Sequence, residues 1–111
     1  MRDEVRSKIQ GYIQNNRVLL FMKGTKSFPQ CGFSAQVVEV LKRTGAEFAT
    51  VNILAEPDLR QGMKEYANWP TFPQLYVDGR FVGGCDIVTD MYQSGELQPV
   101  LERAGATKPA S

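Results

Sequence analysis

The sequence is short of cysteine, of net charge and of long hydrophobic runs, and each shortage excludes a class of protein. Only two of its 111 residues are cysteines, Cys31 and Cys85, too few for a framework of disulfides. The formal net charge of +1 argues against a nucleic-acid or membrane-surface partner bound through bulk charge. No apolar run approaches the roughly 20 residues of a membrane span.

The length predicts one domain with an ordinary hydrophobic core, and no internal repeat or low-complexity stretch interrupts it. We expect this domain to occupy 1–105 and a flexible tail to follow at 106–111. The N-terminus, Met1-Arg2-Asp3-Glu4, lacks the apolar core of a signal peptide. A cytoplasmic location in a bacterium, or an organellar matrix or stroma after processing, is therefore expected.

Helical and strand patterns alternate along the chain and predict an α/β protein. The predicted elements are a helix ending near 15–16, a strand at 17–22, a helix from 32 to about 45, a strand at 48–52, a helix at 58–67, strands at 74–77 and 80–82, and helices after 86 and around 97–101. Asp78-Gly79 predicts the tight turn of a hairpin, and Asp86 is the predicted N-cap of its helix. This order predicts a mixed sheet, in which a parallel pair is extended by the hairpin and covered on both faces.

The first candidate for chemistry is Cys31, at the start of the second predicted helix. Unpartnered N–H groups and the helix dipole favour a thiolate there, and Lys23 is a possible positive neighbour. A thiolate attacks disulfides and binds metals. Because Ser34 stands where a Cys-X-X-Cys pair has its second thiol, Cys31 needs a small thiol, a metal or a distant cysteine as partner. The alternative is a small buried apolar residue.

Two further segments combine rigid backbone with free polar groups. At 69–73, two prolines enforce an extended or turned chain, and a cis bond before Pro73 would let the Phe72 backbone pair with an extended peptide. At 83–86, glycines before a helix would admit a carboxylate, and Asp86 would hold an ammonium group. The alternatives are a stiff loop and a simple helix cap, and Arg60 is by default a solvated surface charge.

Five segments, in this order and at this spacing, resemble the monothiol glutaredoxins of the Cys-Gly-Phe-Ser class over about residues 2–104. They are Phe21-Met-Lys-Gly-Thr, Pro29-Gln-Cys-Gly-Phe-Ser, Leu59-Arg-Gln-Gly-Met-Lys-Glu-Tyr, Asn68-Trp-Pro-Thr-Phe-Pro-Gln-Leu-Tyr and Gly83-Gly-Cys-Asp-Ile. The resemblance implies a thioredoxin-like fold, with a four-stranded mixed sheet flanked by about five helices and with Pro73 cis.

The resemblance also implies a glutathione site. The glutathione sulfur would lie beside Cys31, the Phe72 backbone would pair with the cysteinyl unit, and the γ-glutamyl end would meet Cys85 and Asp86. Lys23 and Arg60 would neutralise the glycine carboxylate. The implied binding residues are Lys23, Cys31, Gly32, Phe33, Arg60, Thr71, Phe72, Pro73, Gly84, Cys85 and Asp86.

In this family the leading role is to hold a 2Fe–2S cluster between two protomers. Each protomer contributes the Cys31 thiolate and a glutathione thiolate, which gives the four sulfurs the cluster needs. We therefore expect a homodimer with the cluster and a monomer without it, and apo iron–sulfur proteins as acceptors. Nucleic acid and membrane are not expected partners.

Two other functions stay open. In the first, Cys31 is the catalytic nucleophile of a weak glutathione-dependent thiol–disulfide oxidoreductase that deglutathionylates proteins. In the second, the protein is a regulatory adaptor that forms a cluster with a different partner. Three roles of Cys85 also stay open: a resolving thiol for Cys31, a glutathionylation site, or merely a small residue whose backbone matters. We favour the last interpretation.

Overall fold

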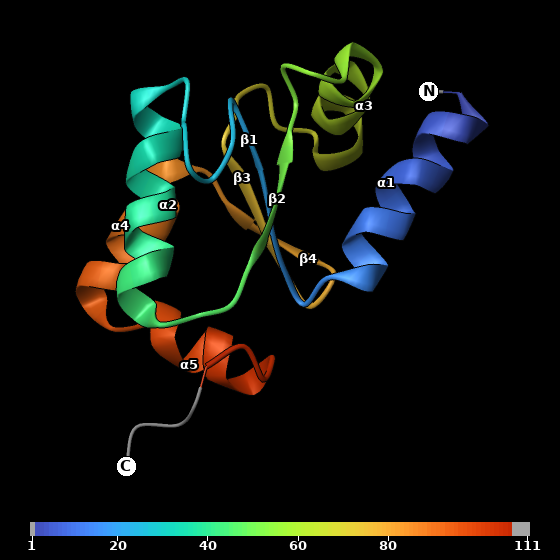
Figure 1. The fold of residues 1–111 in the computed structure, drawn as a ribbon. Helices are drawn as coiled ribbons and strands as arrows, with labels where there is room; N and C mark the ends of the chain where they lie inside the picture. The colour runs from blue at the N-terminus through green and yellow to red at the C-terminus, as the bar shows by residue number, and fades with distance from the viewer. Residues whose placement is uncertain (1, 108–111) are drawn as a thin grey trace.

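A four-stranded sheet with helices on both faces organises the computed structural model, which describes residues 2–107 (Figure 1). The elements of the described chain are α1 (Asp3–Asn15), β1 (Val18–Met22), α2 (Gly32–Thr44), β2 (Ala49–Asn52), α3 (Pro57–Ala67), β3 (Gln74–Val77), β4 (Arg80–Gly83), α4 (Cys85–Ser94) and α5 (Leu97–Arg103).

The strands lie in the order β2-β1-β3-β4. β1 and β2 are parallel and are joined through α2, whereas β1 with β3 and β3 with β4 are antiparallel. Asp78 and Gly79, with φ angles of 55° and 80°, make the turn between β3 and β4, as the Asp-Gly pair predicts. The predicted mixed sheet of a thioredoxin-like fold is therefore confirmed.

β1 is buried along its whole length because both of its faces are covered. Leu19 and Phe21 pack toward α1 and α3, and we call this side the α1 layer. Leu20 and Met22 pack on the other side toward α2, α4 and α5, which we call the α2 layer. Figure 1 shows the two groups of helices on opposite sides of the sheet. Successive residues of one strand thus hold together two separate core layers.

The start of α4 differs from the sequence prediction. The Val88 N–H donates to the Gly84 carbonyl at 3.0 Å, which begins the helix at Cys85 and makes Gly84 the N-cap. The prediction of Asp86 as N-cap is therefore wrong, because the helix begins two residues earlier and places Asp86 in the first helical turn. At the other end of α2, Gly45 forms the predicted left-handed C-cap with φ 78°.

The loop between β1 and α2 closes on itself before it reaches Cys31. The Gln30 N–H donates to the Lys23 carbonyl at 2.9 Å, and Gly24 pairs with Pro29 in an isolated antiparallel bridge. Gly24 has φ 93°, and a Cβ at this position would lie 2.5 Å from the Gln30 nitrogen. Only glycine permits this close return of the chain, which brings Cys31 to the start of α2.

The end of the described chain lies against the domain. The Ala106 N–H donates to the Leu101 carbonyl at 3.0 Å, and the Ala106 carbonyl accepts the Glu47 N–H at 3.2 Å. The rest of the predicted tail, 108–111, lies outside the described residues.

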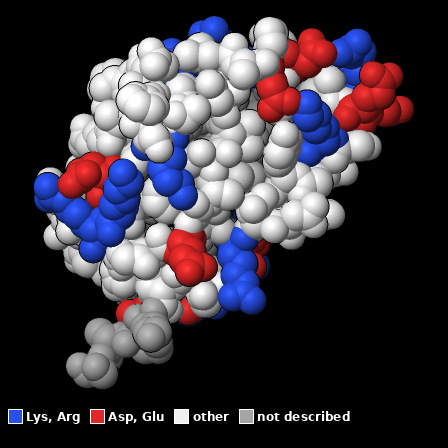
Figure 2. All heavy atoms as spheres, viewed as in Figure 1, with Lys and Arg blue, Asp and Glu red and all other residues white. Residues whose placement is uncertain are grey.

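The surface mixes charges of both signs. Acidic and basic side chains are interspersed on the face that Figure 2 shows, with uncharged surface between them. Ion pairs join α1 to the start of α3, with Arg2 Nη2 lying 2.8 Å from Asp58 Oδ2 and Lys8 paired with Glu56. Among the described residues, no helix combines the length and apolar character that a membrane span requires.

Candidate functional site

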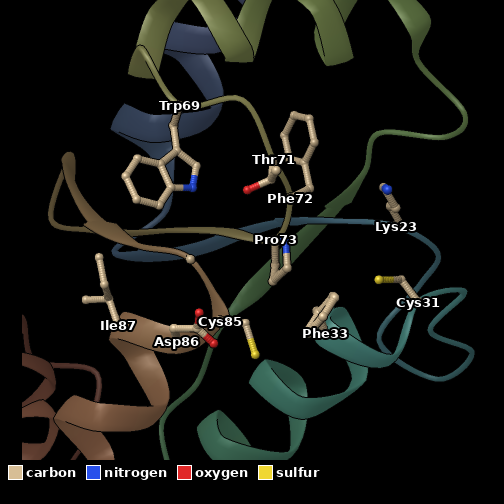
Figure 3. A pocket seen from close by; sticks show the side chains of 11 residues that line it. Lys23, Cys31, Phe33, Trp69, Thr71, Phe72, Pro73, Cys85, Asp86 and Ile87 are labelled. Atoms are coloured by element: carbon tan, nitrogen blue, oxygen red, sulfur yellow. The ribbon is translucent and has the colours of Figure 1, made fainter.

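A pocket of about 520 Å³ opens where the N-termini of α2 and α4 meet the loop that precedes β3 (Figure 3). Its walls combine two thiols, one cation, one carboxylate and several apolar side chains. The lining residues are Lys23, Cys31, Phe33, Trp69, Thr71, Phe72, Pro73, Gly84, Cys85, Asp86 and Ile87.

Nine of the eleven residues predicted from the sequence to bind a ligand line this one pocket. The two others do not line it: Gly32 is the first residue of α2, and Arg60 is an exposed residue of α3. Trp69 and Ile87 line the pocket without having been predicted. The fold therefore brings together the three segments that the sequence singled out, which are far apart along the chain.

Cys31 is the N-cap residue of α2, with an extended backbone (φ −149°, ψ 137°) and a half-exposed side chain. The pKa of its thiol is lowered, mainly by the backbone N–H of Ser34, which stabilises the thiolate. Partial burial opposes this effect, while the Phe33 N–H, the Lys23 charge and the Ser34 hydroxyl add to it. Neither N–H completes a capping hydrogen bond to the sulfur, so the thiolate stays available to an incoming ligand.

The side chain of Ser34 has a structural role in the site. Its side chain is fully buried, and its Oγ accepts the Lys23 N–H at 3.1 Å, which ties the end of β1 to the first turn of α2. The sequence alone shows Ser34 only as a residue that cannot resolve a disulfide. A polar side chain at the third position of a helix can reach back to a backbone N–H, as Glu or Gln does in a capping box, and this is the signal that could have pointed to the contact.

Cys85 differs from Cys31 although both line the same pocket. It is the first residue of α4, only 9% exposed, and burial is the main cause of the raised pKa of its thiol. Its Sγ lies 4.0 Å from the Thr89 hydroxyl, and both cysteines are free. In Figure 3 the Cys31 sulfur points toward the middle of the pocket, whereas the Cys85 sulfur points toward α2. Cys31 is therefore the more reactive thiol of the two.

The loop between α3 and β3 forms the third wall. Its Phe72–Pro73 bond is cis, as the sequence comparison implied, and the Phe72 side chain is buried in the α1 layer. Trp69 packs against Phe81 with ring centroids 5.5 Å apart. The Trp69 Nε1 is buried and has no acceptor among the described residues, and a Cβ at Gly84 would lie 3.3 Å from it.

The described part of one chain offers few metal ligands in one place. Among the described residues, no group of three or more histidine, cysteine, aspartate or glutamate side chains is placed to hold one. Cys31 contributes one accessible sulfur to the pocket, fewer than the four thiolates of an iron–sulfur cluster.

Comparison with known proteins identifies the family. The family model of glutaredoxins matches residues 18–82. Glutaredoxin 4 of Escherichia coli is 57% identical over 99 residues, which are 89% of this chain and 86% of that protein. The chloroplastic monothiol glutaredoxin-S7 of rice (Oryza sativa subsp. japonica) is 56% identical over 101 residues, which are 91% of this chain but only 60% of the rice protein.

Solved structures agree with this result. The solution structure of reduced poplar apo GrxS14 is 54% identical, matches 93% of this chain and 94% of its own, and superposes with a TM-score of 0.81. The crystal structure of a buckwheat glutaredoxin–glutathione complex is 25% identical, matches 96% and 98% of the two chains, and gives a TM-score of 0.83. With the single thiol at the start of α2, these matches show that the chain belongs to the glutaredoxin family, among its monothiol members.

Proposed function

We propose that the protein binds glutathione in this pocket and, as a pair of copies, carries a 2Fe–2S cluster to apo iron–sulfur proteins. One observation supports the proposal most strongly: Cys31, whose thiol pKa is lowered, shares a pocket with the Phe72 backbone and the N-terminus of α4. The site thus offers one reactive sulfur and, beside it, groups that suit a short peptide.

The pocket suits glutathione because its polar groups match that tripeptide in order. Lys23 offers a charge for the glycine carboxylate, and the start of α4 offers unpartnered N–H groups for the γ-glutamyl carboxylate. Asp86, in the first turn, offers a carboxylate for the ammonium group. The buckwheat relative, solved as a glutathione complex, supports the assignment by its likeness in fold.

The cluster would be cargo, and the count of sulfurs explains why it requires two copies. A 2Fe–2S cluster takes four thiolates. Each chain supplies only Cys31, because Ser34 carries no sulfur and Cys85 is buried. Two chains and two bound glutathiones supply four. Since half of these ligands are held without covalent bonds to the protein, the cluster can leave for another protein.

Anaerobic reconstitution tests this proposal. Protein mixed with iron, sulfide and glutathione should become coloured and should elute from a sizing column at the mass of a dimer, whereas the untreated protein should elute as a monomer. Cys31→Ser should abolish the colour, and Cys85→Ser, the matched control, should retain it. A colourless monomer after reconstitution of the wild-type protein contradicts the proposal.

The lowered thiol pKa of Cys31 favours a second candidate function, glutathione-dependent thiol–disulfide exchange. The Cys31 thiolate would attack the glutathione sulfur of a glutathionylated protein, form a Cys31–glutathione disulfide and release the protein thiolate. A second glutathione thiolate would then attack this disulfide, release oxidised glutathione and restore the Cys31 thiolate. The balance is one protein–glutathione mixed disulfide and one free glutathione converted into one protein thiol and one molecule of oxidised glutathione.

A turnover assay separates the two functions. Rapid reduction of a small glutathione mixed disulfide by the cluster-free protein would favour the enzyme, and slow reduction together with dimeric cluster binding favours the carrier.

For the location, we propose a bacterial cytoplasm or an organellar compartment, which the relatives from Escherichia coli and from rice chloroplasts support.

A further inference from the structure

We propose that Gln74 is a positioning residue that aims the Phe72 N–H at the ligand of the pocket. The inference rests on the proposed glutathione site and deepens it. Gln74 is the first residue of β3, its side chain is fully buried, and it is not among the residues that line the pocket. It acts on the ligand only through the loop before it.

The Gln74 amide group is satisfied at both ends. Its Nε2 donates to the carbonyls of Trp69 and Thr71, each at 3.2 Å. The Tyr76 hydroxyl lies 3.4 Å from Gln74 Oε1 and donates to it. Burial raises the pKa of Tyr76, which keeps this hydroxyl protonated. Because a carbonyl only accepts, the two loop carbonyls determine that the nitrogen end of the amide faces the loop.

This contact sets the direction of the next peptide group. Among the described residues the only cis bond is Phe72–Pro73, so the Thr71–Phe72 bond is trans. In a trans peptide the C=O and the N–H point in opposite directions. Since the Thr71 C=O points at buried Gln74, the Phe72 N–H points away from it, on the side where Phe72 lines the pocket.

The Phe72 N–H is also free to bind. Within residues 2–107 no backbone or side-chain acceptor takes a hydrogen bond from it. An extended peptide in the pocket therefore has one aimed backbone donor for a carbonyl, which in glutathione is that of the cysteinyl unit.

An apolar residue in place of Gln74 would remove the two hydrogen bonds that orient the peptide group before Phe72. The carbonyls of Trp69 and Thr71 would lose the donor that they share, and an acceptor shielded from water is costly to leave without a partner. Pro70 and Thr71 are exposed, so the loop has room to turn these carbonyls toward water. That rotation would carry the Phe72 N–H off the ligand.

The test compares Gln74→Met with Tyr76→Phe. The first removes both donors to the loop and keeps the length of the side chain. The second, a matched control, removes only the hydroxyl at the other end of the amide. In calorimetric titrations with reduced glutathione under anaerobic conditions, we expect Gln74→Met to weaken binding about fivefold, the equivalent of one neutral hydrogen bond. Tyr76→Phe should weaken it less than twofold.

Proton NMR adds readouts that a general loss of stability would not change. In the wild-type protein, glutathione should move the Phe72 amide proton downfield as it gains an acceptor, and in Gln74→Met this shift should be absent. If Gln74→Met does not fold, the wild-type shift carries the test. A folded Gln74→Met protein with unchanged affinity and an unchanged Phe72 shift overturns the inference, as does a wild-type Phe72 amide that glutathione leaves unmoved.

The ligand-free protein separates this inference from the proposed function. Both Gln74 side-chain amide protons should exchange slowly with water, because they are buried and hydrogen-bonded. Fast exchange refutes the contact with the loop whatever the ligand is. Absence of glutathione binding by a wild-type protein with slow Gln74 exchange refutes the proposed function instead.

Discussion

Removing the hydroxyl of Ser34 should reduce stability far more than it changes the reactivity of Cys31. In Ser34→Ala the Lys23 N–H loses the Oγ that accepts it at 3.1 Å. A buried or partly buried donor left without a partner costs about 1–3 kcal/mol, so the free energy of unfolding should fall by this amount. The reactivity should change little, because the Ser34 backbone N–H has the largest effect on the pKa of Cys31 and the hydroxyl the smallest.

Two assays on the same variant check this prediction. Denaturant unfolding measures the free energy, with Ser94→Ala as the matched control. Ser94 is exposed and its hydroxyl donates only to the Met91 carbonyl, so its loss should change stability by no more than about 0.5 kcal/mol. The pH dependence of alkylation measures the pKa of Cys31, on a Cys85→Ser background. A Ser34→Ala protein with unchanged stability, or with a Cys31 pKa returned to the ordinary value, would refute the reasoning.

Three further predictions follow from the pocket and the loop beside it. Alkylation of Cys31 should set in at lower pH than that of an ordinary thiol and alkylation of Cys85 at higher pH, since their pKa values are lowered and raised, and mass spectrometry of each peptide measures this. Equal profiles would contradict it. In denaturant unfolding, Gly24→Ala should lower the free energy of unfolding clearly more than Gly45→Ala. Both glycines have positive φ, but only at position 24 would a Cβ meet backbone atoms, at 2.5 and 2.6 Å, whereas nothing lies within 4 Å at position 45. Equal losses of stability in the two variants would contradict this prediction, because they would mean that the loop shifts to make room for the Cβ. Trp69, the only tryptophan, lines the pocket, so its fluorescence should change saturably with glutathione, and a constant signal would place the ligand elsewhere.

Cys31 also makes stability depend on pH. Because the folded protein lowers the pKa of this thiol, its thiolate adds to the free energy of unfolding above the pKa of the unfolded chain. That contribution is lost as the pH falls through the pKa of the folded state. Cys31→Ser should remove this part of the pH dependence, which unfolding curves at several pH values would measure.

Local patterns were enough to predict most of the fold. Asp78-Gly79 predicts its turn because the positive φ angles are a property of the dipeptide, and Gly45 predicts the end of α2 for the same reason. The prediction of the N-cap of α4 failed because Gly84 and Asp86, two residues apart, are both acceptable caps. The choice between them depends on how the chain leaves β4.

The site was predicted only where it rests on short motifs. Trp69, in the loop before β3, lines the pocket and packs against Phe81 of β4. No pattern in the sequence around the tryptophan predicts that contact. Gln74 reads as one polar residue at the start of an apolar strand. Its hydrogen bonds to a loop that returns past it depend on the tertiary fold. Both residues act through neighbours that only the folded chain provides.

The pocket also lies where the two core layers meet. Phe72 belongs to the α1 layer and Cys85 to the α2 layer, yet both line the same pocket. A molecule bound there would contact both halves of the interior at once, so its binding free energy would oppose unfolding of the whole domain and not of one loop. The concentration of that molecule around the protein would then raise the free energy of unfolding, independently of any chemistry at Cys31.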